Sequence, residues 1–299
     1  MSNESVTLTW HSQNQKGSPQ RHEGPKEHKI FLFFLISFLS ATLRAERNEG
    51  TFRRLLHMPV GRSQILAGKL SAAVMVGCVQ VVIMFAVGHF AFGMGLGSAP
   101  IALAVLTFSV VLAAVGLGLT AAAFNLENVL TVPLIVAALI GGCMFPVDWL
   151  PPFIRTVGYA VPHTWAMGGY QDLLVRRRGP LEILPGVGVL LGFALMTVSA
   201  AAVVVGMGIM IASVVRSEGQ AGALPDLVVI SMAVVSGAMF PSIRIPGLMY
   251  VTPHYWAIQG FQDLMMRGLG VNAVLDEAGI LLGMAAILFA VGVARFKFE

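Results

Sequence analysis

Two histidine–aspartate pairs are the side chains of this sequence whose types could support acid–base chemistry. His163 and Asp172 lie in the stretch PHTWAMGGYQDLLVRRRG, and His254 and Asp263 lie in its near copy, PHYWAIQGFQDLMMRGLG. Each histidine precedes its aspartate by nine residues, and at about 100° per residue a helix turns two such side chains to opposite faces. A His–Asp dyad within either segment is therefore not expected. No other acid, base or metal-ligand set converges in the sequence, so a membrane-embedded enzyme is the least favoured class.

We call the two stretches the first and second PHxWA segments, residues 162–179 and 253–270. Each offers only about 13 residues before an arginine, too few to cross a hydrocarbon core of about 30 Å. Small residues three positions apart make flat faces for close helix packing: Ala166 and Gly169, Ala257 and Gly260. Aromatic residues suit the level of the lipid headgroups: Trp165, Tyr170, Tyr255 and Trp256. We expect each segment to form a re-entrant or interfacial helix, with these candidate residues: His163, Trp165, Gln171, Asp172, His254, Trp256, Gln262 and Asp263.

The composition indicates that these segments belong to a helical membrane protein. Hydrophobic residues make up 56% of the 299 residues and charged residues 11%, whereas a soluble domain carries about 25% charged residues. The apolar runs are long and do not alternate as barrel strands would. They fall at about 30–43, 70–95, 101–124, 129–146, 183–215, 224–241 and 278–294. We expect an all-α polytopic fold with about six to seven transmembrane helices plus the two short re-entrant or interfacial helices.

The remaining composition sets limits on partners and ligands. Residues 1–29 are polar and predict a disordered tail. Cys78 and Cys143 lie inside apolar runs and form neither a disulfide framework nor a metal cluster, so no metal site is expected. The net charge of +4 bears on membrane topology, and no nucleic-acid motif accompanies it.

The C-terminal two thirds of the sequence read as one unit written twice. GGCMFP and SGAMFP precede the two PHxWA segments, and LLGFALMTVSA and LLGMAAILFAV follow them. Repeats of this kind predict repeated structural units, here residues 106–199 and 200–299, after an N-terminal membrane part at 30–105. The last helix of the first copy continues into the first helix of the second. One long span at 183–215 can then serve both copies, which makes the copies parallel.

A charged stretch between two apolar segments, RAERNEGTFRRLLHMPVGRSQILAGKL, spans residues 44–70. Glu49 and Arg53 are spaced for an i,i+4 ion pair in the favourable order. Phe52, Leu55 and Leu56 form one apolar stripe. These residues describe a short amphipathic helix on the membrane surface. Composition alone favours an ordinary interfacial loop with a positive-inside anchor instead.

This stretch resembles the cytoplasmic loop of ABC-2 type exporter permeases, with their E-R-E-x-G-T-x-x-R-L-L…P-x-x-R-x-x-I-L-x-G-K pattern. GLGLTAAAF, MFPVDWLPP and the PHxWA…QDLL block resemble later parts of that family in the same order, so the likeness covers roughly 31–299. It implies a multi-pass permease subunit in a bacterial or archaeal plasma membrane, with both PHxWA segments on the outer side. Such a subunit belongs to an ATP-driven exporter of amphiphilic, drug-like or lipid-like substrates.

The resemblance also implies partners. Loop 44–69 is similar to a coupling helix that docks on a separate ABC ATPase (nucleotide-binding) subunit. A second permease copy or a homologous permease would complete a dimer within membrane lipid. The residues that match the family's docking loop are Glu46, Arg47, Glu49, Gly50, Thr51, Arg53, Arg54, Leu55 and Leu56.

The chain itself is not expected to hydrolyse ATP. In GRSQILAGKL six residues separate the glycines and a leucine follows the lysine. A P-loop needs four residues there and a serine or threonine after the lysine. ATP is therefore expected to act through the partner subunit, with no cofactor bound directly, and the chain is a transport subunit and not an enzyme.

Two departures from the family keep a second function class open. The family has one more helix and an extracellular stretch before the loop, and it has one copy of the C-terminal unit. A non-transporting membrane scaffold, or a fusion remnant of two permeases, is therefore the alternative. The distribution of Lys and Arg favours a tail on the cytoplasmic side, in which case segment 30–43 dips into the membrane without spanning it.

Overall fold

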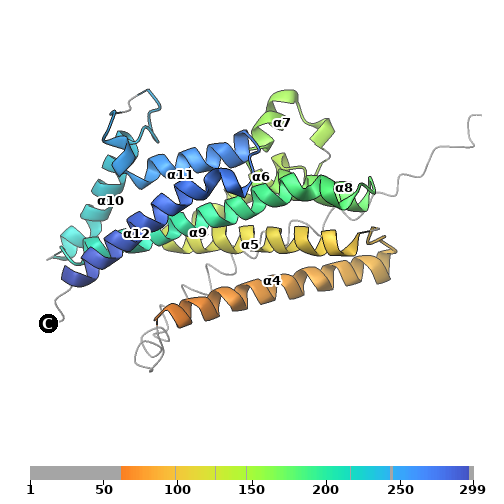
Figure 1. The fold of residues 1–299 in the computed structure, drawn as a ribbon, viewed down its shortest axis with the longest axis horizontal. Coiled ribbons are helices and arrows are strands. Elements are labelled where there is room, and N and C mark those ends of the chain that lie inside the picture. The colour runs from red at the N-terminus through yellow and green to blue at the C-terminus, as the bar shows by residue number, and fades with distance from the viewer. Residues whose placement is uncertain are drawn as a thin grey trace, which may run out of the picture.

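The computed structural model describes residues 62–295 apart from residues 98, 125, 146, 216, 243 and 244 (Figure 1). The regular elements of this part are helices, which confirms the predicted all-α fold. Four helices are long and apolar enough to cross a membrane, and two shorter helices are also apolar. The four are α4 (Arg62–Phe92), α5 (Pro100–Phe124), α9 (Leu184–Ala212) and α12 (Leu275–Arg295), and the two are α6 (Glu127–Ile140) and α10 (Glu218–Val235). Segment 30–43 and the tail 1–29 lie outside the described residues.

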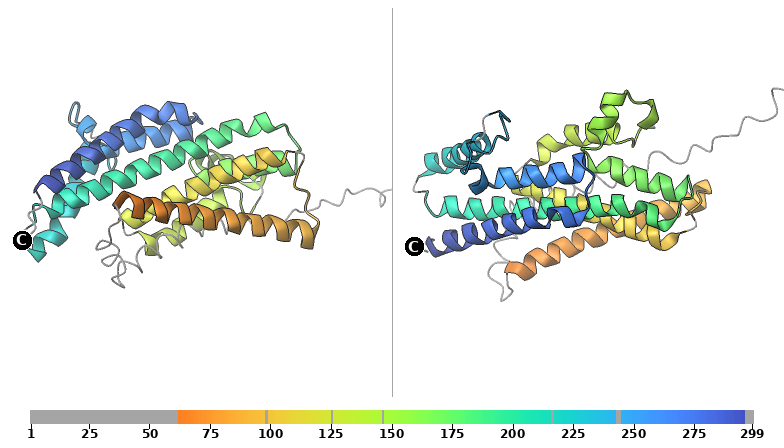
Figure 2. Two further views of the ribbon diagram at one scale, coloured as in Figure 1. Left: turned by 60° about the horizontal axis from the view of Figure 1, so that its bottom comes forward. Right: turned by 45° about the horizontal axis from the view of Figure 1, so that its top comes forward.

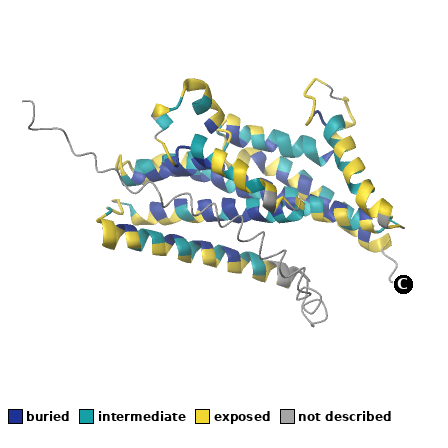
Figure 3. Cartoon of the chain, turned by 180° about the vertical axis from the view of Figure 1, so that it is seen from behind, coloured by how far each residue is buried: buried dark blue, intermediate teal, exposed yellow. Residues whose placement is uncertain are grey.

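The long helices lie side by side in the order α4, α5, α9, α12 (Figures 1 and 2). Helices α5 and α9 are much more buried than α4 and α12, most of whose side chains are exposed (Figure 3). The core accordingly follows the α5–α9 contact, where Leu106, Val110, Val189 and Leu190 are almost fully buried. In a membrane the exposed apolar side chains of the outer helices face lipid or another helix.

Helix α4 begins at Arg62, inside the stretch predicted to be a loop up to residue 69. The sequence here, RSQILAGK, is rich in residues that favour a helix and contains no proline. The apolar run marks where a helix can enter lipid, but it does not mark where the helix starts. The cytoplasmic loop predicted at 44–69 is therefore helical over its last residues, 62–69.

Helix α9 is a single α-helix of 29 residues, about 44 Å long at 1.5 Å per residue. Helix α5 packs along its first part, where Thr120 Oγ1 donates a hydrogen bond to Thr197 O over 2.8 Å. Helix α12 packs along its last part, where Gly206 lies against Ala285 and Leu288. The expectation that one helix serves two neighbouring bundles is thus consistent with the packing. Since α9 exceeds a hydrocarbon core of about 30 Å, it must tilt or extend beyond it.

Short helices connect the long ones, and each of two connections contains one PHxWA helix. After α6 come η2 (Val147–Trp149), α7 (Pro152–Gly158), α8 (Pro162–Leu174) and η3 (Pro180–Ile183), and then α9. After α10 come η4 (Met249–Val251), α11 (Pro253–Phe261), the π-helical turn η5 (Gln262–Met266) and η6 (Val271–Val274), and then α12. Each PHxWA segment therefore lies in the connection between a short apolar helix and the long helix that follows it.

Candidate functional site: the two PHxWA helices

Both PHxWA segments begin a helix at their proline. Pro162 is the first residue of α8 and Pro253 the first of α11. Proline suits this position because its missing N–H would have no partner in the first turn and its φ is already helical. The 13 residues of α8 extend about 20 Å, which is too short to cross the membrane. The structure thus contains the two short helices that the sequence predicts, and their role on the outer side stays a prediction.

The two tryptophans make matching hydrogen bonds. Trp165 Nε1 donates to Tyr159 O over 3.1 Å, and Trp256 Nε1 donates to Tyr250 O over 2.8 Å. Each bond reaches back six residues and ties the first turn of the helix to the loop before it. The indole positions are therefore set by the backbone of the connecting loop, and the two tryptophans stand at equivalent places.

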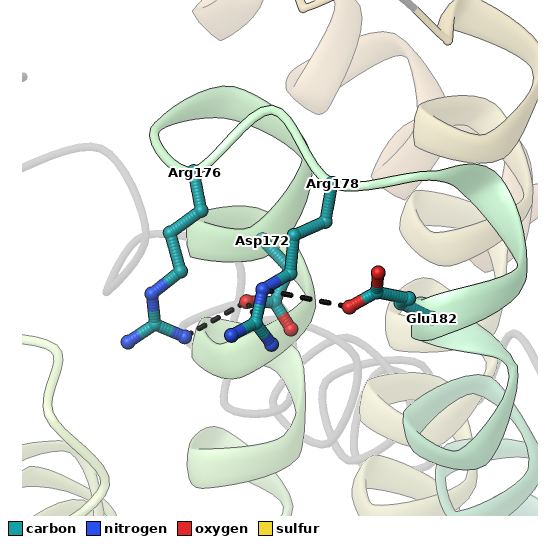
Figure 4. Close-up of polar contacts among 4 residues, drawn as sticks. All are labelled: Asp172, Arg176, Arg178 and Glu182. Carbon is teal, nitrogen blue, oxygen red and sulfur yellow. Dashed lines mark hydrogen bonds and ion pairs between the residues drawn. The ribbon is translucent and has the colours of Figure 1, made fainter.

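The two aspartates bind arginines near the C-terminal ends of their helices. Asp172 Oδ1 lies 2.8 Å from Arg176 Nη1 and 3.4 Å from Arg178 Nη1 (Figure 4), and Arg178 Nε lies 3.4 Å from Glu182 Oε2. Asp263 forms the matching ion pair with Arg267. The arginine side chains are about half exposed, so each pair contributes roughly 0.2–1 kcal/mol. Asp172 thus pairs with arginines, a pairing that the sequence analysis did not predict.

The two glutamines end the helices through their carbonyl groups. Gln171 O accepts hydrogen bonds from Val175 N and Arg176 N over 3.0 and 2.9 Å. Gln262 O accepts one from Arg267 N over 3.1 Å. Both carbonyls satisfy amides of the turn that leaves the helix. The sequence pointed to the side chains of these two glutamines, whereas in the structure their backbone carbonyl groups make the hydrogen bonds that end the helices.

His163 is almost fully buried: it is 1% exposed and packs against Gly141 at the end of α6. Burial lowers the pKa of His163 from 6.5 to about 3. His254 is less deeply buried, and burial lowers its pKa as well. Both imidazoles are therefore neutral near pH 7, and His163 packs α8 against the end of α6.

The burial of His163 predicts a pH-dependent stability. Its folded-state pKa lies below its unfolded-state value, so the unfolded chain binds the proton first and stability falls as pH drops below 6.5. Between pH 7.5 and 5.5 we expect His163 to account for a loss of about 1.4 kcal/mol in the free energy of unfolding. Unfolding of detergent-purified protein at both pH values measures this loss. A His163→Gln variant with an equal pH dependence would contradict it.

The small faces of the PHxWA helices are in close contact with long helices. A Cβ at Gly169 would lie 2.8 Å from Leu106 Cδ2 of α5. A Cβ at Gly260 would lie 2.8 Å from Met196 Sδ of α9. Both contacts confirm the packing role expected of these glycines. Helix α8 packs on α5 through Gly169 in the same way that α11 packs on α9 through Gly260.

Tyr170 packs inside the protein, whereas its residue type suggested contact with the lipid headgroups. Its side chain is buried, and its hydroxyl forms a hydrogen bond of 3.1 Å with Thr107 Oγ1 of α5. Burial raises the pKa of Tyr170 to about 12. Because Tyr170 follows Gly169, the close approach of α8 to α5 brings its ring into the core. Phe261 takes the matching place in α11 and lies against Phe193, with ring centroids 5.5 Å apart.

The contacts of α5 with α9 were missed by reasoning from the sequence. Gly116 of α5 lies against Thr197 and against Ala194, whose carbonyl oxygen is 3.1 Å from the position of a Cβ. The signal was present in the similar stretches GLGLTAAAF, from Gly116, and GMGIMIASV, from Gly206. Their glycines could have been interpreted as helix-packing positions.

The nine residues predicted to contact an ATPase subunit lie outside the described residues. The sequence places them before α4, whose first residue is Arg62. Their role stays a prediction, as does that of the eight PHxWA residues. Within the described ranges, no three His, Cys, Asp or Glu side chains gather as metal ligands would.

Comparison with known proteins then decides the family. The family model of the ABC-2 type transporter matches residues 6–175 and 181–266. The chain belongs to the ABC-2 type transporter family. This chain is also 31% identical over 180 residues to the linearmycin resistance permease protein LnrN of Bacillus subtilis. The alignment covers 56% of this chain and 46% of the relative. The chain thus matches about half the length of that relative, and no solved structure matches it.

The family match, the permease relative and the four apolar spans all indicate a multi-pass membrane protein. This chain is a multi-pass membrane protein of the ABC-2 type transporter family, located in the plasma membrane. The two stretches matched by the family model end at Val175 and Met266, each at the end of one PHxWA helix.

Proposed function

We propose that the chain is the membrane-spanning subunit of an ATP-driven exporter that moves an amphiphilic, drug-like or lipid-like substrate out of the cell. A separate ABC ATPase subunit would supply the energy by docking on residues 44–56. The observation that carries the proposal is the family match, whose first stretch includes this loop. ABC transporters of this kind work with ATPase subunits and as dimers of permeases.

The placement of the helix ends supports a docking face at one end of the bundle. The start of α4 and the ends of α5, α9 and α12 lie toward the same end, on the left in Figure 1. Residues 44–61 directly precede α4 in the chain. An ATPase bound to them would therefore contact the end of the bundle where three long helices finish, and movement of that subunit would be passed to those helices.

The nature of the spans supports an amphiphilic substrate. Helices α5 and α9 contain no charged residue, and their polar groups include Thr107, Thr120 and Thr197. An ion of either sign would find no countercharge along these helices. The name of the Bacillus subtilis relative associates that permease with resistance to linearmycin, which favours export over uptake.

We also propose that residues 106–199 and 200–299 are two copies of one unit, after an N-terminal part at 30–105. Matching contacts support this: Gly116 with Thr197 and Gly206 with Leu288, Gly169 with Leu106 and Gly260 with Met196. Helix α10 has 18 residues where α6 has 14, and the loop after it is shorter. The copies would share α9 as the last helix of one and the first of the other.

Reversing the charge of the docking loop is expected to abolish binding of the ATPase. Arg53→Glu together with Arg54→Glu would place two carboxylates in a surface that offers arginines to its partner. The wild-type chain, expressed with a candidate ABC ATPase from the same genome, should retain that ATPase during affinity purification, and the double variant should not. An Arg177→Glu variant, which reverses a charge after α8, should retain it.

Equal retention of the ATPase by the double variant would contradict docking at this loop. The alternative function, a non-transporting scaffold or fusion remnant, predicts no coupling to nucleotide. Vesicles that contain the chain and the ATPase decide between the two. A substrate that stimulates ATP hydrolysis supports the exporter, and hydrolysis that no candidate amphiphile changes supports the remnant.

A further inference from the structure

The turn that follows α8 carries three consecutive arginines, whereas the equivalent turn after α11 carries one. The first turn reads Arg-Arg-Arg, residues 176–178, and the second reads Arg-Gly-Leu, residues 267–269. Each turn closes through a backbone hydrogen bond from the N–H of its third residue to the aspartate carbonyl oxygen, over 2.8 Å in the first and 3.0 Å in the second. The second turn thus folds in this way with a single arginine, and the fold does not explain the other two. We call residues 176–178 the arginine turn.

The middle residue of the arginine turn has a backbone conformation that suits glycine. Arg177 has a φ of 51°, and among the described residues it is the one non-glycine residue with a positive φ. The second turn has Gly268 at this place, with a φ of 65°. A Cβ at Gly268 would lie 2.9 Å from Trp165 Cη2, whereas the side chain of Arg177 is exposed and has room. Glycine would relax the backbone at position 177, and a side chain kept in a strained conformation is typical of functional sites.

Arg177 is also the arginine of this turn that has no carboxylate partner within the described part of the chain. Arg176 pairs with Asp172 over 2.8 Å. Arg178 lies 3.4 Å from Asp172 and 3.4 Å from Glu182 (Figure 4). Arg177 forms no ion pair with any described residue. The turn therefore holds three cations against two carboxylates, whereas in the second turn one arginine faces one aspartate.

The arginine turn lies where the chain enters the membrane. The candidate span that contains α9 begins at Pro180, two residues after the turn. Large apolar side chains on both sides of the turn are exposed: Val175, Leu181 and Leu184. An excess cation at the level of the lipid headgroups, beside exposed apolar side chains, suits a ligand with an anionic head and an apolar tail.

We propose that the arginine turn binds the phosphate headgroup of an anionic phospholipid. A guanidinium group presents a planar fork of donors that fits two phosphate oxygens. Arg177 supplies this fork, and the ion pairs of Arg176 and Arg178 with Asp172 hold the turn around it. The acyl chains of the lipid would contact the exposed apolar side chains beside the turn. The second turn has a balanced charge and is not such a site.

A positively charged anchor without a preferred ligand is the alternative, because arginines beside a span can act only by fixing its orientation. An anchor needs charge but no arginine with a positive φ. It predicts that the loss of an arginine from either turn has the same effect on lipid binding.

Lipid titration of the full chain, purified in detergent, tests the proposal. Native mass spectrometry counts bound dioleoylphosphatidylglycerol, with the zwitterionic dioleoylphosphatidylcholine in parallel. Arg177→Gln should lower the association constant of the first phosphatidylglycerol by roughly fivefold, the effect of one arginine near an anionic surface, and leave phosphatidylcholine binding unchanged. Arg267→Gln removes the paired arginine of the second turn and, as the matched control, should bind as the wild type does. Equal affinities of the wild type and Arg177→Gln, or equal losses in the two variants, would overturn the proposal.

A glycine variant separates binding from folding. Arg177→Gly removes the cation and relaxes the positive φ. The lipid-free variant should therefore melt at or above the wild-type temperature, while its affinity for phosphatidylglycerol falls as in Arg177→Gln. Arg177→Lys keeps the charge without the planar fork and should have an intermediate affinity. A lower melting temperature of Arg177→Gly would show that Arg177 serves the fold, and wild-type lipid affinity of this variant would contradict the site.

Inorganic phosphate distinguishes a lipid from a soluble anion. Millimolar phosphate should leave the bound phosphatidylglycerol in place, because the acyl chains also contribute to binding. Displacement of the lipid by inorganic phosphate would assign the turn to a soluble anion and contradict a lipid site. The site is independent of the proposed exporter, since an Arg177→Gln chain should lose the lipid and still retain the ATPase. The Arg53→Glu, Arg54→Glu chain should lose the ATPase and keep the lipid.

Discussion

Leucine at position 206 is expected to destabilise the folded chain severely, whereas leucine at position 208 of the same helix is expected to have little effect. A Cβ at Gly206 would lie 2.9 Å from Ala285 O and 3.3 Å from Leu288 Cβ. The first of these is a backbone atom inside a helix and cannot turn aside. The whole of α12 would have to move away from α9, and overpacking of this kind costs about 3 kcal/mol or more.

The matched pair separates this effect from the general cost of the substitution. Gly208 has open space where a Cβ would be, so Gly208→Leu introduces the same side chain without a clash and should raise helix propensity slightly. Thermal unfolding of both variants in one detergent measures the difference. Equal melting temperatures would show that α9 and α12 do not pack through Gly206.

Alanine at the adjacent positions 168 and 169 is expected to act in opposite directions. A Cβ at Gly169 would lie 2.8 and 2.9 Å from the two Cδ atoms of Leu106. Leu106 is fully buried and cannot swing away, so Gly169→Ala should cost about 1–3 kcal/mol. Gly168 has nothing within 4 Å, so Gly168→Ala should stabilise α8 by up to about 1 kcal/mol, the gain in helix propensity.

The same experiment bears on the proposed duplication. Gly260 stands against Met196 as Gly169 stands against Leu106, so Gly260→Ala should also destabilise the chain. A methionine side chain is more flexible than leucine, and a smaller loss is expected there. Denaturant titration of the three variants gives the free energies of unfolding. A stable Gly169→Ala chain would contradict the close approach of α8 to α5.

Much of the fold could be predicted because lipid leaves few choices to an apolar chain. The apolar run at 101–124 corresponds to α5, Pro100–Phe124, and the run at 183–215 contains α9, Leu184–Ala212. Backbone groups in lipid must bond within their own segment, so a long apolar run becomes a helix. The prolines that begin α8 and α11 also marked their helix starts, because proline suits a first turn.

The candidate site was predicted less completely. Its short helices and their small faces followed from length and spacing, and the separation of His163 from Asp172 followed from helical geometry. The arginine partners of Asp172 include Arg178, which lies beyond the end of the helix. Helical periodicity cannot predict a contact with a residue outside the helix. The burial of Tyr170 was not predicted, because its type suits both an interface and a hydrogen-bonded core position.

The sequence by itself determined that this protein is a bundle of membrane helices with a repeated short element and the motifs of ABC-2 permeases. Those features depend on local pattern: apolar length, proline position and small-residue spacing. Only the tertiary structure decided which glycines are in contact with another segment and which face open space. Gly188 and Gly192 are covered, whereas Gly279 and Gly283 are not. Identical spacing along the chain cannot tell these cases apart, because the difference depends on whether another segment returns to that face.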